Sequence, residues 1–127
     1  MNENGIGDIV VTTAITIHKD LGPGLLESVY ETILAKELEK SGLSVKRQVT
    51  VPIKYKGITF QEAFRADLIV ENKVIIELKS VENINNAHKK QVLTYLRLTG
   101  IKLGYLLNFG AGLMKEGIFR IINGKLR

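Results

Sequence analysis

The chain has 127 residues, of which 45% are hydrophobic and none is cysteine. This length fits one globular domain, residues 1–127, and the lack of cysteine excludes disulfides and thiolate metal sites. Eighteen basic against thirteen acidic residues give a net charge of +5, which favours a polyanionic partner. No apolar run reaches the roughly 18 residues of a membrane span, and the N-terminus lacks a signal pattern. We therefore expect a cytoplasmic protein with no membrane partner.

Two helices are predicted in the first third of the chain. Apolar residues recur at helical spacing over 6–21, and the sequence Gly-Pro-Gly at 22–24 ends that helix. A second apolar stripe covers 26–38, and Gly42 follows it as a left-handed cap. Glu27 lies at the N-terminal end of this second helix, where the helix dipole favours a carboxylate.

The rest of the chain predicts five strands and one further helix. Strands are expected over 44–55, 74–81, 102–109 and 117–123, and over 58–63 with a possible continuation into the strand that carries Asp67. A helix is expected to run to about Thr99, with Asn83, Asn85 and Asn86 as candidate N-caps. Pro52 inside the first of these strands indicates an edge strand or a bulge. Because the helix connects two strands, at least one strand pair is parallel and the sheet is mixed.

The segment 65–79, RADLIVENKVIIELK, predicts a buried β-hairpin that carries charged residues. A three-residue turn at 71–73 sets Asp67 directly opposite Glu77 on one face. It places only apolar residues on the other face: Ala66, Leu68, Val70, Val74, Ile76 and Leu78. A two-residue turn would mix the faces, so the hydrophobic pattern favours the longer turn. Adjacent carboxylates repel each other, and a hard cation such as Mg²⁺ or Mn²⁺ would remove that cost.

The last predicted helix carries a polar and aromatic stripe. His88, Gln91 and Tyr95 are spaced i, i+3 and i+7, so they share one side of the helix. The basic residues around them form either a solvated face or a DNA-contacting surface: Lys89, Lys90, Arg97 and Lys102.

Two signatures together resemble a known family. GLLESVY at 24–30 comes first, and Asp67, nine residues and Glu-Leu-Lys then precede QVLTY at 91–95. This order resembles the GxxExxY family, small bacterial and archaeal proteins within the PD-(D/E)XK nuclease superfamily. The resemblance covers roughly 6–123 and implies a restriction-endonuclease-like α/β core: a mixed β-sheet flanked by helices, in the order α-α-β-β-β-α-β-β. Ala66 stands where the superfamily has its namesake proline.

The resemblance also implies a set of site residues. Asp67, Glu77 and Glu27 match the metal ligands, which would hold Mg²⁺ or Mn²⁺. Lys79 matches the catalytic lysine, and Gln91 a catalytic residue of the helix motif in the RecB-like and lambda-exonuclease-like branches. The simpler alternatives are a solvated carboxylate pair neutralised by lysine and an ordinary exposed glutamine.

Three further residues are candidate substrate contacts. Tyr95 belongs to the same helix motif, and His88 shares its stripe and could meet a phosphate. Tyr30 either contacts substrate or packs beneath the site. A packing or surface role is the alternative for each of them.

The leading hypothesis is a metal-dependent nuclease that hydrolyses phosphodiester bonds, with DNA favoured over RNA. One alternative is a catalytically silent nucleic-acid-binding or assembly module on the same fold. Another is a structural protein with a chance carboxylate pair, which would bind no metal. A domain of this size offers little surface for gripping a duplex, so a homodimer is an open alternative.

Overall fold

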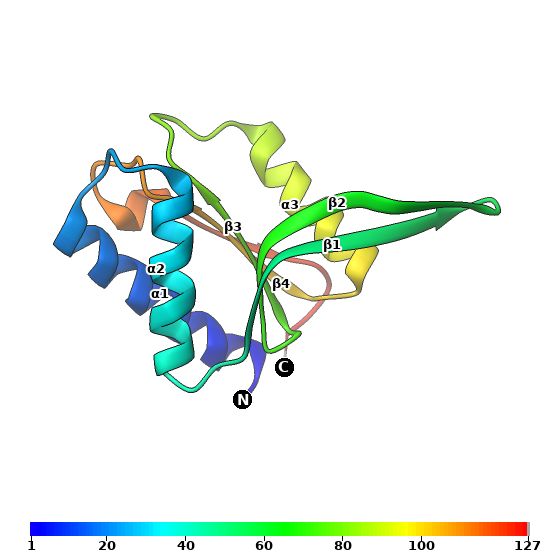
Figure 1. Ribbon diagram of the computed structural model, residues 1–127, viewed down its shortest axis with the longest axis horizontal. Coiled ribbons are helices and arrows are strands. Elements are labelled where there is room, and N and C mark those ends of the chain that lie inside the picture. Colours follow the sequence, from blue (N-terminus) through cyan, green and yellow to red (C-terminus); the bar gives the residue numbers. More distant parts are fainter. Residues whose placement is uncertain (127) are drawn as a thin grey trace.

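The computed structural model describes residues 1–126 as a mixed sheet with helices on both sides (Figure 1). The elements in chain order are α1 (Glu3–Leu21), α2 (Glu27–Lys40), β1 (Val45–Tyr55), β2 (Ile58–Val70), β3 (Val74–Lys79), α3 (Asn86–Thr99), β4 (Leu103–Asn108), the 3-10 helix η1 (Met114–Gly117) and β5 (Ile118–Ile122). The predicted order of helices and strands is confirmed. Within the described residues, no helix is both long and apolar enough to cross a bilayer.

The five strands lie side by side in their order along the chain, β1-β2-β3-β4-β5. All neighbouring pairs are antiparallel except β3 and β4, which are parallel and connected by α3. This confirms the mixed sheet that the crossover helix predicted. Strand β1 is an edge strand, and its register shifts between Val51 and Ile53, so Pro52 lies where proline costs no ladder hydrogen bond.

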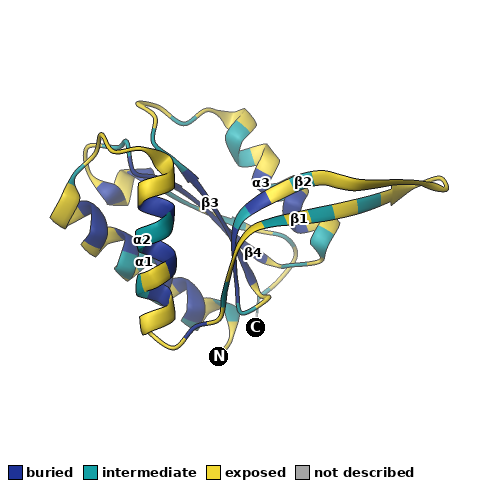
Figure 2. Ribbon diagram, in the orientation of Figure 1, coloured by how far each residue is buried: buried dark blue, intermediate teal, exposed yellow. Residues whose placement is uncertain are grey.

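Two hydrophobic clusters fill the two faces of the sheet. Helices α1 and α2 cover one face and α3 covers the other (Figure 1). The larger cluster joins α1 and α2 to the face of β3 that contains Val74, Ile76 and Leu78. The smaller cluster joins α3 to Ile69 and Ile75. Both faces of β3 are therefore buried, as Figure 2 shows, so Glu77 is surrounded by protein, while Lys79 at the strand end is half-buried.

The hairpin of β2 and β3 has the predicted register. Its pairs are Leu68 with Ile76, Ile69 with Ile75 and Val70 with Val74. In the turn, Glu71 and Asn72 both have a φ of 54°, and the Lys73 amide donates to the Val70 carbonyl at 2.9 Å. Two successive positive φ values match the twist of a tight hairpin. The three-residue turn is thus confirmed.

The hairpin ladder ends earlier than the sequence predicted. Beyond Leu68, β2 pairs only with β1, so Ala66 lies opposite Val49 and not opposite Leu78. Ala66 consequently joins the α3 cluster instead of the α1–α2 cluster. The reason is that β3 continues beside β4 while β2 bends away with β1. The two strands therefore separate at Asp67 and Glu77.

Beyond the body of the domain, β1 and β2 form a long two-stranded arm (Figure 1). We define the free arm as residues 53–62. The predicted turn at its tip is confirmed, with Lys56 at a φ of 47° and Gly57 at 81°. Every residue from 54 to 62 is exposed (Figure 2).

Candidate active site

Asp67 and Glu77 meet where the two strands of the hairpin separate. The Asp67 amide donates to Glu77 Oε1 at 3.0 Å, and the Leu78 amide donates to Asp67 Oδ2 at 2.9 Å. Each carboxylate thus accepts a hydrogen bond from a backbone N–H of the opposite strand. These two N–H groups lie beyond the last pair of the β2–β3 ladder. Buried N–H groups need an acceptor, so these two side chains also stabilise the fork in the sheet.

Proximity and burial make this pair electrostatically costly. Glu77 is only 7% exposed. Burial, followed by the negative charge of Asp67, raises the pKa of Glu77 to about 9, although the positive charge of Lys79 opposes the rise. Among the described residues, the ion pairs are Lys40–Glu37 and Arg47–Glu31, so neither carboxylate of the fork has a cationic partner within 4.0 Å.

Helix α2 brings Glu27 toward the same place. Partial burial raises the pKa of Glu27, the positive charge of Lys79 lowers it, and the negative charges of Asp67 and Glu31 raise it further. These mutual effects put Glu27 in the electrostatic neighbourhood of Asp67 and Lys79. Its carboxylate lies in the first turn of α2, where the helix dipole is favourable.

Tyr30 holds the loop in front of Glu27 in place. Its ring is fully buried and stacks on Phe109, with ring centroids 4.5 Å apart. Its hydroxyl donates to the Gly22 carbonyl and accepts from the Leu25 amide at 3.2 Å. This placement suits the packing alternative and leaves no surface for a substrate contact.

Helix α3 contributes Gln91 and Tyr95. Burial raises the pKa of Tyr95, the charges of Glu77 and Asp67 raise it further, and the nearby Gln91 amide lowers it. The Tyr95 ring is stacked on Phe64 of β2, with centroids 4.0 Å apart and planes 8° apart. Gln91 is exposed. Two residues of the predicted stripe, Gln91 and Tyr95, therefore lie near the carboxylates and the strand that carries Asp67.

His88 has a local role that the sequence did not reveal. Asn85 caps α3 by accepting from the His88 amide at 3.0 Å, and His88 Nδ1 accepts from the Asn85 amide at 3.3 Å. This reciprocal pair is a capping box. The Nδ1 atom is used at the helix start, and the predicted phosphate contact stays a prediction that only Nε2 could fulfil.

Sequence analysis did not predict a hydrogen-bond network of three residues that reaches Asp67. Glu31 is buried and accepts from Arg47 Nη2 at 3.1 Å and from Gln48 Nε2 at 2.5 Å. The same Gln48 nitrogen lies 3.3 Å from Asp67 Oδ1. A signal was present, because Glu31 follows Glu27 by four residues and so shares its side of the helix.

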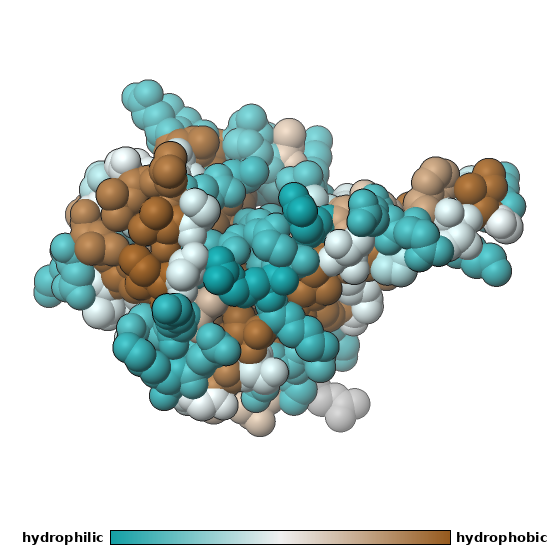
Figure 3. All heavy atoms as spheres, in the orientation of Figure 1, coloured by the Kyte–Doolittle hydropathy of each residue, from teal (hydrophilic) through white to brown (hydrophobic). Residues whose placement is uncertain are grey.

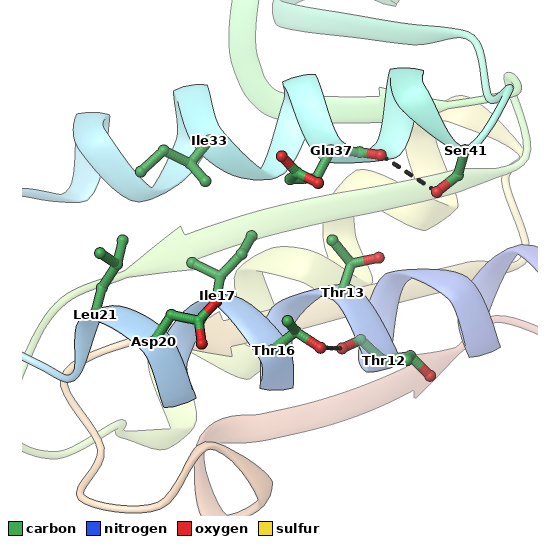
Figure 4. Close-up of a pocket in the computed structure, with 9 residues that line it drawn as sticks. All are labelled: Thr12, Thr13, Thr16, Ile17, Asp20, Leu21, Ile33, Glu37 and Ser41. Atoms are coloured by element: carbon green, nitrogen blue, oxygen red, sulfur yellow. Dashed lines mark hydrogen bonds between the residues drawn. The ribbon is translucent and has the colours of Figure 1, made fainter.

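A groove in the described part of the chain lies elsewhere. It has a volume of 460 Å³ and lies between α1 and α2, away from the fork (Figure 4). The hydroxyls of Thr13, Thr16 and Ser41 in its lining all donate to carbonyls of their own helices. These groups are already satisfied, so the groove presents little chemistry.

A mixed sheet that forks over two carboxylates, with a lysine two residues beyond the second, defines a nuclease-like α/β domain. A family model described as the PD-(D/E)XK nuclease superfamily matches residues 4–121, and the chain belongs to this superfamily. The fold is accordingly restriction-endonuclease-like, as the resemblance implied. No curated protein and no solved structure matches the chain.

Proposed function

We propose that this protein is a Mg²⁺- or Mn²⁺-dependent nuclease that hydrolyses phosphodiester bonds in DNA. The observation that carries the proposal is the meeting of Asp67 and Glu77 at the fork of β2 and β3, with Lys79 on the same strand. Membership of the superfamily supports a nuclease-like domain and an interaction with nucleic acid. A cytoplasmic location remains a prediction.

The residues at the fork fit a divalent metal. Within residues 1–126, no three acidic or histidine side chains converge closely enough to hold an ion by themselves. Mg²⁺ does not need such a cage, because it commonly uses one or two carboxylates and fills its other positions with water and phosphate oxygens. Asp67 and Glu77 would supply the carboxylates, with Glu27 as a further ligand or a hydrogen-bond partner of bound water. When bound, the metal would polarise the phosphate and acidify a water molecule.

The side chains around the fork have separate proposed roles. The attacking water gives its oxygen to phosphorus and loses a proton, the P–O3′ bond breaks, and the O3′ atom gains a proton. Lys79 is a positive charge that would stabilise the extra negative charge on the phosphorus oxygens. Gln91 would orient the water or a phosphate oxygen, and Tyr95 would border the bound strand.

The experiment is a cleavage assay on single-stranded and duplex DNA and on RNA. We expect the wild type to cleave DNA with Mg²⁺ or Mn²⁺ and to stop on addition of EDTA. Asp67→Asn and Glu77→Gln should abolish cleavage, whereas Glu39→Gln, at an exposed position of α2, should not. A wild type that leaves all these substrates intact with both metals would contradict the proposal.

One observation favours the silent binding module as the second candidate. Asp67 Oδ2 and Glu77 Oε1 already accept backbone hydrogen bonds, so the fork is stable without an ion. This candidate expects nucleic-acid binding that is the same with EDTA as with Mn²⁺, and no cleavage. Calorimetry with Mn²⁺ separates the two candidates. The nuclease requires Mn²⁺ binding that the Asp67→Asn substitution removes, whereas the binding module requires no Mn²⁺ binding.

A further inference from the structure

The charges of this protein are divided unevenly between its two parts. Residues 1–44, which include α1 and α2, carry seven acidic and three basic residues, a net charge of −4. Residues 45–127 carry fifteen basic and six acidic residues, a net charge of +9. The basic part contains the arm and α3, and no acidic residue occurs from 83 to 115. A polyanion is thus attracted to the arm and α3 and repelled by α1 and α2.

The free arm has one apolar face, which is exposed to solvent. Strand register puts Ile53 opposite Phe60 and Tyr55 opposite Ile58, so these four side chains share a face. Tyr55 is 62% exposed, Ile58 58% and Phe60 50%. Figure 3 shows this apolar surface gathered at the end of the arm. The opposite face presents Lys54 beside Thr59.

Lysines lie next to Tyr55, one of the two exposed rings. Lys56 Nζ lies 5.4 Å from the centre of the Tyr55 ring, and Lys54 precedes that ring in β1. Exposed aromatic rings interleaved with lysines are the combination that binds single-stranded nucleic acid, because bases stack on the rings while ammonium groups meet phosphates. The chemistry of the arm therefore matches an unpaired strand.

The base of the arm leads directly to the candidate active site. Phe64 lies in β2 between the free arm and Asp67, and its ring stacks on Tyr95 of α3. This stack joins the arm to the helix that carries the exposed cations Lys90 and Arg97. A strand bound along the arm would reach the fork at the foot of β2.

We propose that the free arm binds a single strand of nucleic acid, with Tyr55 and Phe60 stacking on bases and Lys54 and Lys56 contacting phosphates. One part of this inference rests on the proposed function, namely that the arm leads the bound strand toward Asp67 and Glu77. Beyond the proposed function, the inference names what the arm recognises. This is an unpaired segment of the substrate at a distance from the bond that is cut.

A second copy of this chain is the rival occupant of the arm. Stable interfaces usually involve about 20–30 residues on each side, and the free arm has only residues 53–62. Symmetric pairing of two arms would also bring Lys54 and Lys56 of both copies together. Area and charge thus favour nucleic acid.

The test measures fluorescence anisotropy of a labelled single-stranded oligonucleotide in EDTA, so that no turnover is needed. Tyr55→Ala with Phe60→Ala should weaken binding roughly ten-fold or more, because each base–aromatic stack contributes measurably. Lys54→Gln with Lys56→Gln should lower the slope of log K against log salt by about 1.4, from 0.7 for each cation.

Matched controls use the other side of the molecule. Leu113→Ala removes an apolar side chain that is 56% exposed outside the arm. Lys19→Gln with Lys36→Gln changes the net charge as much as the arm pair does, but on α1 and α2. Both controls should bind like the wild type, and all variants should keep the wild-type melting temperature because every substituted side chain is exposed.

Cleavage of a minimal diester with Mn²⁺ separates the arm from the catalytic site. Arm variants that lose oligonucleotide affinity while cleaving the minimal diester normally would support the inference. Arm-dependent binding without any cleavage would support the inference and contradict the nuclease. Unchanged binding by the arm variants, or a wild type that binds no oligonucleotide, would overturn it. The inference would also be overturned if sedimentation showed a dimer that the arm substitutions dissociate while the oligonucleotide affinity stays unaltered.

Discussion

Gln48 bridges Asp67 to the buried Glu31, and it does so from a strained backbone. Its side-chain nitrogen lies 3.3 Å from Asp67 Oδ1 and 2.5 Å from Glu31 Oε1, and its φ is 49°. Positive φ is unfavourable for residues other than glycine, so the surrounding structure holds Gln48 in place. One amide group therefore fixes the orientation of a proposed metal ligand.

The first prediction separates the backbone of Gln48 from its side chain. Gln48→Ala keeps the strain and loses both hydrogen bonds, whereas Gln48→Gly loses the bonds and relieves the strain. We expect Gln48→Gly to be more stable than Gln48→Ala by roughly 1 kcal/mol in urea unfolding. Both variants should cleave DNA more slowly because Asp67 is less well oriented. Equal stability of the two would show that the strain is absent in solution.

The second prediction concerns Lys79, which has no ion-pair partner within 4.0 Å among the described residues. Lys79→Ala should lower the cleavage rate by about 10²–10³, the usual cost of removing one preorganised charge stabiliser. Calorimetry should show Mn²⁺ affinity that is kept or increased, since a positive charge leaves the fork. Loss of Mn²⁺ binding would assign Lys79 to the architecture of the fork instead.

The third prediction uses the two roles of Asp67. Asp67→Asn removes the repulsion with ionised Glu77 yet retains an oxygen for the Leu78 amide. We therefore expect a higher melting temperature in EDTA above pH 9, where Glu77 is ionised, and no cleavage. Asp67→Ala also removes the repulsion, but it leaves the Leu78 amide without its acceptor, at a cost of about 1–3 kcal/mol. The alanine variant should therefore melt below the asparagine variant. An asparagine variant that melts below the wild type would mean that the repulsion is small.

The fourth prediction follows from the raised pKa of Glu77. A folded-state pKa of about 9 against an ordinary 4.5 means that the folded protein binds the proton more tightly than the unfolded chain does. This contribution to stability is complete below pH 4.5 and is lost as the pH rises toward 9. Urea unfolding in EDTA should show stability falling with pH across this window.

Glu77→Gln is the matched control for this pH dependence, because its amide cannot titrate. We expect its stability to change less with pH over the same window. The smaller remaining slope should have the same sign, since the pKa of Glu27 is also raised. An identical slope in wild type and variant would exclude Glu77 as the origin.

Sequence reasoning predicted the hairpin register because a wholly apolar face tolerates no slip by one residue. Val70 and Val74 could flank only a three-residue turn without exposing the face. The end of the ladder at Leu68 was not predictable in the same way. The end of the ladder depends on the pairing of β2 with β1, which continues after the pairing of β2 with β3 has stopped. No local pattern in 65–79 indicates where β2 stops pairing with β3.

For the candidate site, too, local features were predictable from the sequence and contacts between distant segments were not. The spacing of Asp67, Glu77 and Lys79 lies within one hairpin, so it could be read from the chain. Gln48 lies within the strand predicted over 44–55, and nothing in a glutamine signals a positive φ. The burial of Tyr30 depends on its stacking with Phe109, a contact between segments distant in sequence.

The fork in the sheet also has a consequence for the order of folding. Asp67 and Glu77 lie on the two strands of one hairpin, and hairpins close within about 1–10 μs. The parallel pairing of β3 with β4 requires α3 to fold and cross over first, which is slower. We therefore expect the carboxylates to come together while water still surrounds them, and to be desolvated when the helices dock. We expect alkaline pH to slow this late docking step and to leave the early collapse of the hairpin unchanged.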